Sequence, residues 1–352
     1  MKLRKVLLLS LLVLLAIVGG AIFWVLREIR SPVSHAHSSE YITIPRGSSP
    51  DEITKHLADL GVIRRTWPLQ IYMKLQGSSS RLKAGDYRFP SPISPLAVLS
   101  KLEAGQQRLE RFTVIEGWTR WDVALALSHL PELETPETDQ LLELMNNTNL
   151  IRDLDPHATN LEGYLYPDTY SFPPSTSAEE IIATMVKRFR QVWTQEQAGK
   201  ASGQNRSVRE IVTIASLIET EAKLKEERPM IASVIYNRLN IKMPLGIDST
   251  IIYASKMAGK WKNDGKVYQS DLDRVSPYNT RRVRGLPPGP VASPAARSLA
   301  AALNPADTDY LFYVRNPSRD DGAHNFYSND SEFQNGVKAL REWERTRDAR
   351  QR

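Results

Sequence analysis

The feature that most constrains this chain is an unbroken apolar stretch near its N-terminus. Val6–Leu26 contains 21 residues without a charge and is dominated by Leu, Val and Ile. A helix of that length rises about 30 Å, enough to cross the hydrocarbon core of a bilayer. Lys2, Arg4 and Lys5 precede it, so the positive-inside rule puts residues 1–5 in the cytoplasm. We therefore expect a transmembrane helix, with the rest of the chain on the far side of the membrane.

A cleaved signal peptide is the alternative interpretation of this stretch. Gly19, Gly20 and Ala21 are small residues of the kind that signal peptidases require. The length of the apolar run favours an uncleaved anchor.

The composition narrows the class of protein further. The chain has no cysteine, so its exported part has no disulfides, which fits a bacterial envelope. The net charge of +6 is compatible with an anionic polymer or membrane surface nearby. There is no HExxH motif, zinc spacing, arginine-rich block or RNA-binding aromatic signature. We expect no metal or other cofactor and no nucleic-acid partner.

A small α+β module is expected over residues 41–107, after a linker at 27–40. Ser49, Pro50 and Glu52 have the spacing of a capping box with proline in the first helical turn. Strands are predicted at Tyr41–Pro45 and Ala84–Phe89, and further helices at Trp67–Leu75 and Ser94–Leu102.

A larger domain of mixed α+β type is expected over residues 108–340, with a charged tail at 341–352. About 230 residues suffice for one sizeable core. Helices are predicted at Trp121–Leu130, Thr138–Leu144, Ala178–Gln195 and Ala295–Leu303. Two more helices are predicted to begin at Val208 and near Pro229, and an aromatic strand is predicted at Tyr310–Val314.

One of these helices carries acidic residues where hydrocarbon is expected. In the run Ile211–Ala222, Glu219 shares a stripe with Val212 and Ala215, while Glu221 lies beside a second apolar stripe. A buried carboxylate is costly, so it is usually paired or used chemically. The small neighbours of Glu219 leave room for another group to approach it. A polar seam in which both glutamates cap or pair is the alternative.

Five ordered blocks of sequence carry a family resemblance. They are Leu161-Glu-Gly-Tyr-Leu-Tyr-Pro-Asp-Thr-Tyr170, Ala215-Ser-Leu-Ile-Glu219-Thr-Glu221, Val234-Ile-Tyr-Asn237-Arg238, Asp248-Ser-Thr-Ile-Ile-Tyr253, and Ser276-Pro-Tyr-Asn-Thr280 followed by Gly285-Leu-Pro-Pro-Gly289. This order closely resembles the YceG-like endolytic murein transglycosylases (MltG), from the membrane anchor to about residue 340.

The resemblance implies a single-pass protein of the bacterial inner membrane with a LysM-like module and a periplasmic catalytic domain. Such enzymes cut peptidoglycan glycan strands internally, between N-acetylmuramic acid and N-acetylglucosamine, and leave 1,6-anhydromuramic ends. The family's catalytic glutamate corresponds to Glu219. The resemblance also implies interaction with peptidoglycan synthases of the penicillin-binding type. Whether the module binds glycan or serves as a spacer stays open.

This chemistry suits one carboxyl group. Ordinary glycosidases use two carboxylates, one of which activates water or attacks the sugar. In a lytic transglycosylase the muramic 6-hydroxyl attacks instead, so Glu219 can act first as acid and then as base. The rival functions are a glycan hydrolase that uses a second carboxylate such as Asp248, and a non-catalytic scaffold that binds wall polymer or synthases.

Five further residues are candidates for substrate binding. Glu221 contacts substrate or orients Glu219, or else forms a salt bridge with Arg238 or Lys225. Asp248 bonds a sugar, or else caps the helix that follows it. Tyr278 and Asn279 line a glycan groove or form a turn after Pro277, and Tyr166 joins the groove or packs in the core.

The chain departs from the family pattern beside Asp248. Many members have Gln and then Thr or Ser before this aspartate and Pro after it, where this chain has Gly246, Ile247 and Ser249. The loss of polar side chains is expected to alter substrate preference and to leave the chemistry of Glu219 intact.

Overall fold

The computed structural model describes residues 2–105, 108–130, 136–174 and 176–351. The chain forms two compact units, residues 1–110 with 171–176, and residues 111–170 with 177–352. Helices are combined with short two-stranded sheets, in agreement with the predicted α+β class. The predicted end of the module at residue 107 lies outside the described residues.

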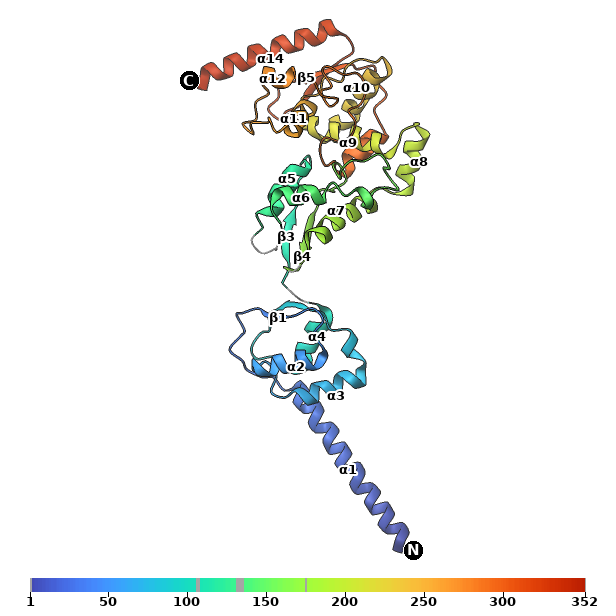
Figure 1. The fold of residues 1–352 in the computed structure, drawn as a ribbon, viewed down its shortest axis with the longest axis vertical. Helices are drawn as coiled ribbons and strands as arrows, with labels where there is room; N and C mark the ends of the chain where they lie inside the picture. The colour runs from blue at the N-terminus through green and yellow to red at the C-terminus, as the bar shows by residue number, and fades with distance from the viewer. Residues whose placement is uncertain (1, 106–107, 131–135, 175, 352) are drawn as a thin grey trace. The chain divides into compact units, whose positions relative to one another are not determined.

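The first unit begins with a long helix, α1 (Lys2–Arg30) (Figure 1). From Leu9 to Arg30 this helix is long and apolar enough to cross a membrane. It is exposed along most of this length, whereas Ile29 near its end is buried. The predicted apolar helix is therefore present, and its C-terminal part packs against α3 and α4 of the same unit.

The rest of the first unit confirms the predicted elements. The capping box forms at Ser49, whose backbone N–H donates to Glu52 (2.7 Å) and whose hydroxyl accepts from the Glu52 backbone N–H (3.3 Å). Strands β1 (Ile42–Ile44) and β2 (Gly85–Tyr87) pair antiparallel. The helices are α2 (Pro50–Asp59), α3 (Thr66–Gln76) and α4 (Pro95–Ala104), and they enclose a core that includes Leu57, Ile63, Leu69, Tyr87, Phe89 and Leu102.

The second unit contains helix α9 (Val208–Glu221), in which every residue from Ile211 to Glu219 is buried. This helix packs chiefly against α13 and also contacts α8, α10 and α11. A capping box of Ser207 and Glu210 starts α9. The other elements are β3 (Glu110–Thr113), paired with β4 (Thr169–Phe172), α5 (Arg120–Ser128), α6 (Thr138–Leu144), α7 (Ala178–Val192), α8 (Gln195–Gly203), α10 (Arg228–Asn240), α11 (Asp248–Met257), α12 (Gln269–Leu272), α13 (Ala296–Leu303), β5 (Phe312–Arg315), β6 (His324–Tyr327) and α14 (Asp330–Gln351).

The structure corrects two predicted elements. The helix expected over Ala178–Gln195 ends at Val192, because the Thr194 side chain caps a new helix at Gln195. The aromatic strand is Phe312–Arg315, and its partner strand, His324–Tyr327, was missed. Strand pairing depends on contacts between distant segments, which a single periodic run does not reveal.

A buried carboxyl group in the first motif predicts a pH effect on stability. Glu162 is buried and accepts from the backbone N–H of Arg120 (3.2 and 3.1 Å). Burial is the main cause that raises its pKa to about 7. Because the pKa of Glu162 is higher in the folded state than in the unfolded state, this group contributes to the free energy of unfolding. The contribution is complete below the unfolded-state pKa, near 4.5, and is lost as pH rises through the folded-state pKa of about 7. The contribution of Glu162 that is lost is about 3 kcal/mol.

Glu162→Gln should therefore lose less unfolding free energy between pH 5 and pH 8 than the parent chain does, by about 3 kcal/mol. Chemical unfolding at the two pH values measures the difference. The matched control is Glu179→Gln on the exposed surface of α7, which should follow the parent. Equal pH dependence of the parent and Glu162→Gln would contradict the assignment of this effect to Glu162.

Candidate functional site

Glu219 lies in the last turn of α9 with both carboxylate oxygens engaged. Its side chain is buried, and the residue as a whole is only 9% exposed. Oε1 accepts a hydrogen bond from Nη2 of Arg228 (3.0 Å), and Oε2 accepts from the backbone N–H of Ala295 (2.8 Å). Each oxygen keeps a further lone pair. The side chain is therefore held in one orientation, and the carboxylate still has a lone pair that can accept a proton.

The partners of Glu219 come from two other helices. Arg228 is the first residue of α10, is buried, and donates from Nε to Oγ of Ser298 on α13 (3.0 Å). Ala295 is the N-cap residue of α13, where unpaired backbone N–H groups favour a negative charge. Three helices thus meet at one carboxylate.

The small residues beside Glu219 admit a segment of the same chain. Oγ of Ser216 accepts from the backbone N–H of Val291 (3.1 Å). Val291, Ala292 and Ala295 are buried, and the first and last of them contact α9 through their backbone N–H groups. The room predicted next to Glu219 is therefore filled in part by the segment that delivers the N–H of Ala295.

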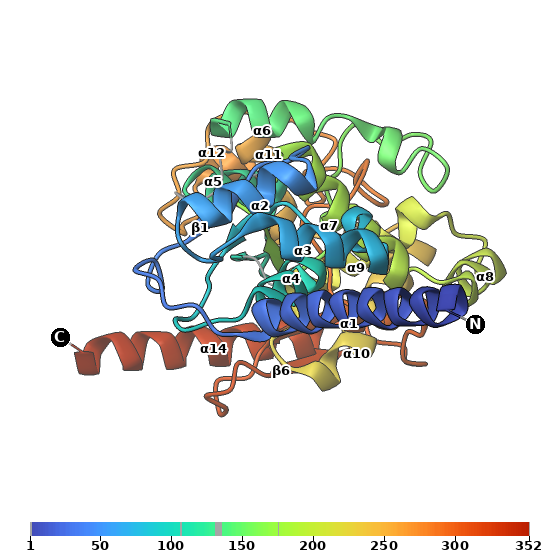
Figure 2. The same ribbon diagram turned by 90° about the horizontal axis from the view of Figure 1, so that it is seen from below.

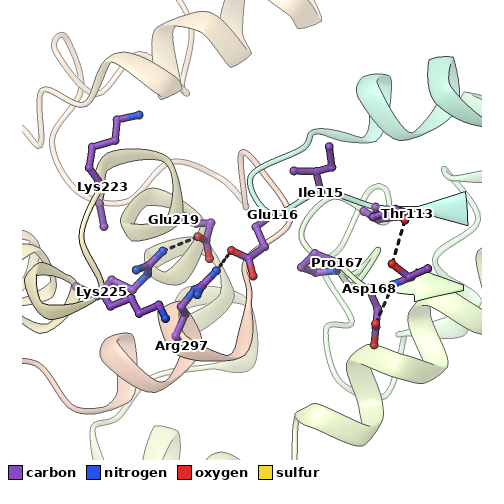
Figure 3. A pocket seen from close by; sticks show the side chains of 13 residues that line it. Thr113, Ile115, Glu116, Pro167, Asp168, Glu219, Lys223, Lys225 and Arg297 are labelled. Carbon is purple, nitrogen blue, oxygen red and sulfur yellow. Dashed lines mark hydrogen bonds and ion pairs between the residues drawn. The ribbon is translucent and has the colours of Figure 1, made fainter. Parts of the chain in front are cut away.

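Glu219 borders a cavity of about 670 Å³. Figure 3 shows Glu219 and Arg297 on one wall and Asp168 on the opposite wall. The cavity is lined by Thr113, Val114, Ile115, Glu116, Pro167, Asp168, Thr169, Glu219, Ala222, Lys223, Lys225, Arg228 and Arg297. A cavity of this size can admit a sugar-sized ligand beside the carboxylate.

Two other carboxylates line this cavity, and each is paired with an arginine. Glu116 forms an ion pair with Arg297, and Asp168 accepts from Nε of Arg188 (2.7 Å). Neither Glu116 nor Asp168 was predicted from the sequence as an acid of the site. Asp248, the second carboxylate predicted for a hydrolase, does not line the cavity.

Glu221 is half-buried and faces a different group. Its Oε2 accepts from the hydroxyl of Tyr313 (2.8 Å), and burial is the main cause that raises its pKa. The suggested salt bridge to Arg238 or Lys225 is wrong, because Glu221 forms no ion pair within the described residues, and the side chain of Arg238 donates to the backbone carbonyls of Leu311 (2.6 Å) and Leu245 (2.5 Å). Two residues that are neighbours in sequence thus belong to different sites.

Asp248 is exposed at the start of α11. Arg281 donates to its Oδ1 from Nε (3.0 Å) and Nη2 (2.7 Å). The suggested role as helix N-cap is wrong, because Ile247 occupies the cap position and Asp248 is the first helical residue.

The three departures from the family pattern have structural roles of their own. Gly246 has a φ of 65°, and Ile247 is buried. The hydroxyl of Ser249 accepts from that of Thr220 (2.8 Å). The side chain at position 247 therefore packs inside the protein.

The two residues after Pro277 are buried. Tyr278 packs against Tyr253, with ring centroids 4.8 Å apart. The Asn279 amide donates to the carbonyls of Leu272 and Arg274 (2.9 Å each) and accepts from the Arg281 N–H (3.2 Å). Asn279 thus holds a turn together.

Tyr166 lies closer to the carboxylate. Its hydroxyl accepts from the backbone N–H of Ala296 (3.2 Å), the residue after the one that binds Glu219. Tyr166 is buried and does not line the cavity. Within the described part of the chain, no group of three or more His, Cys, Asp or Glu residues could hold a metal ion.

Comparison with known proteins decides the family. The sequence model of the YceG-like family matches residues 42–339, most of the chain. The chain belongs to the YceG-like family. The resemblance noted in the sequence motifs is therefore confirmed.

Relatives of this YceG-like protein agree with the assignment. An endolytic murein transglycosylase of Bacillus subtilis is 35% identical over 85% of this chain and 84% of its own length. One of Streptococcus pneumoniae is 31% identical over 79% of this chain and 55% of its own length. A crystal structure of a YceG-like protein from Listeria monocytogenes matches with a TM-score of 0.57 and 30% identity, over 85% of this chain and 99% of that one.

Proposed function

We propose that this protein is an endolytic peptidoglycan lytic transglycosylase and that Glu219 is its catalytic acid and base. Its relatives named endolytic murein transglycosylases make it an enzyme of the lytic transglycosylase class. The single observation that carries the role of Glu219 is a buried carboxylate held by two donors at the edge of a cavity of about 670 Å³.

The reaction has two proton transfers at one carboxyl group. The protonated form of Glu219 gives its proton to the glycosidic oxygen as the bond from muramic C1 to that oxygen breaks. The carboxylate then takes the proton of the muramic 6-hydroxyl as O6 bonds to C1. The products are a free N-acetylglucosamine hydroxyl and a 1,6-anhydromuramic end, and no water is consumed. Arg228 and the Ala295 N–H keep the carboxylate in place through both transfers.

The other proposed substrate residues take different roles. Asp248 is the exposed member of the set and is proposed to contact substrate. Buried Tyr278 and Asn279 are proposed to position the loop after α12, and Glu221 to position the end of α9. Tyr166 is proposed to position the start of α13 beside Glu219.

The location follows from α1. The proposal places α1 across the bacterial inner membrane with its N-terminus in the cytoplasm, and the catalytic unit in the periplasm next to peptidoglycan strands. The order β1, α2, α3, β2 in the first unit supports a LysM-like module. Penicillin-binding-type synthases are proposed as partners from the family resemblance.

Product analysis tests the reaction. The full chain in detergent is incubated with isolated peptidoglycan, and the released fragments are weighed. We expect fragments from within strands that are lighter than hydrolytic fragments by the mass of one water molecule. Reducing-end products would instead establish a hydrolase, with Glu116 or Asp168, which also line the cavity, as the second carboxylate. Absence of cleavage under conditions that support a relative from the same family would favour a scaffold.

A further inference from the structure

An apolar groove lies between α1 and α3 in the first unit, far along the chain from Glu219. Its volume is about 500 Å³. Figures 1 and 2 show α3 beside the C-terminal part of α1, in agreement with the contacts between the two helices. The groove is lined only by aliphatic and aromatic residues, namely Ala21, Ile22, Trp24, Val25, Leu26, Trp67, Ile71, Tyr72 and Leu75.

Helix α3 is apolar on two faces. Leu69 and Met73 are buried in the core of the module. Trp67, Ile71 and Leu75 recur every fourth residue on another face and are exposed, Leu75 by 81%. Large apolar side chains that are exposed in one stripe mark a surface that binds a membrane or another protein.

The depth of this stripe is set by α1. Trp24 lies 19 residues after Lys5, a rise of about 28 Å along a helix, so it reaches the far boundary of a hydrocarbon core of about 30 Å. The rings of Trp24 and Trp67 are stacked, with centroids 5.2 Å apart. Helix α3 is therefore fixed at the depth where tryptophan prefers to lie in membranes.

Basic side chains lie near the stripe along the chain. Arg64, Arg65 and Lys74 flank or lie on α3, and Arg27 and Arg30 end α1; all five are exposed. The guanidinium carbon of Arg65 lies 5.3 Å from the ring centroid of Trp24. Cationic groups on apolar stems near a membrane boundary can reach lipid phosphates while their stems remain in the apolar region.

We propose that α3 is an in-plane membrane-docking helix. Acyl chains of the leaflet into which α1 emerges fill the groove and cover Trp67, Ile71 and Leu75, and the basic side chains meet the phosphates. The inference rests on α1 spanning the membrane and goes beyond peptidoglycan cleavage. It predicts that the first unit contacts the bilayer through both α1 and α3, so that this unit cannot rotate freely about the end of α1.

The absence of cysteine allows a direct test with the full chain. Ile71→Cys and Leu75→Cys variants carry an environment-sensitive fluorophore and are reconstituted in phosphatidylglycerol-containing vesicles with brominated acyl chains. Lys55→Cys on the exposed surface of α2 is the matched control, and Leu15→Cys in α1 reports insertion of the anchor. We expect labels at positions 15, 71 and 75 to be quenched at least several-fold more than the label at position 55.

Three outcomes would overturn the proposal. Quenching at position 15 with labels at 71 and 75 no more quenched than that at 55 would refute docking and leave the anchor intact. Labels at 71 and 75 that are shielded from both lipid bromine and aqueous iodide would show that a second copy of the chain covers the stripe. No quenching at position 15 would refute the anchor and the docking together, and would leave the product analysis unaffected.

Discussion

Glu219→Gln is expected to reduce the release of anhydro ends by about 10²–10⁴-fold, the range for loss of a general acid and base. The amide has nearly the shape of the carboxyl group and cannot exchange a proton with a glycosidic oxygen at neutral pH. The NH₂ group of the amide is itself a donor, so it cannot accept a hydrogen bond from Arg228 or from the Ala295 N–H, and one of these two bonds is lost. The measurement is the initial rate of anhydro-fragment release from isolated peptidoglycan, with thermal unfolding to verify the fold.

The matched control for this variant lies two residues along the same helix. Glu221→Gln keeps a side-chain oxygen that can accept from Tyr313, so the end of α9 stays in position, and residue 221 does not line the cavity; the rate should therefore remain within a few-fold of the parent's. If Glu219→Gln keeps the parent rate, Glu219 is not the catalytic group. If Glu221→Gln loses as much activity as Glu219→Gln, the distinction between the two sites on α9 is wrong.

Arg228→Met is expected to destabilise the protein by about 3–5 kcal/mol, because it leaves one charge of a buried ion pair without its partner. Arg228 contacts Glu219 at 3.0 Å and Ser298 at 3.0 Å, and both side chains of the ion pair are buried. Chemical unfolding of the full chain in detergent measures the loss. Since Arg228 also orients Glu219, the rate of anhydro-fragment release should fall in the same variant.

A double-mutant cycle separates the ion pair from packing. In the Glu219→Gln background, Arg228→Met should cost less than it does in the parent, because no buried carboxylate is left unpaired. Arg297→Met is the control for the loss of an exposed ion pair with Glu116, and it should cost about 1 kcal/mol or less. Equal costs of Arg228→Met in both backgrounds would show that the pair with Glu219 does not hold this site together.

Glu219→Gln and Arg228→Met test two different parts of the same site. In the proposed reaction Glu219 supplies the proton, and Arg228 and Ala295 hold its side chain through hydrogen bonds; these groups come from α9, α10 and the start of α13. Preorganised donors around a reacting carboxyl group remove the need to reorient it during the reaction. The cavity adds Glu116 and Asp168, each neutralised by an arginine, which leaves Glu219 as the acid whose partners are both buried.

Local sequence patterns predicted much of this architecture. The helical period and the small residues around Glu219 predicted a buried carboxylate with space beside it, and α9 shows both. Ser49 and Glu52 predicted the start of α2 because a capping box involves only residues within one turn. The motif order identified the family, which the match to residues 42–339 confirms.

Contacts between distant segments escaped these patterns. The sequence suggested that Glu221 pairs with Arg238 or Lys225. In the structure the hydroxyl of Tyr313, 92 residues away, donates a hydrogen bond to Glu221 instead. Asp248 has the residue type of a helix cap, but the chain enters α11 one residue earlier and Arg281 binds the carboxylate instead. In both cases several partners were chemically equivalent, and only folding selected one.

The sequence by itself determined the elements whose energetics are local. These are the apolar helix α1, the capped starts of α2 and α9, and the burial of Glu219 on a helix face, each set by residues within a few turns of one another. The tertiary structure alone decided which groups meet the carboxylate. Ala295 is 76 residues from Glu219 along the chain, and it reaches Oε2 because α13 packs on α9. A charge is buried only where distant groups compensate it, so the site becomes defined when the helices are packed together.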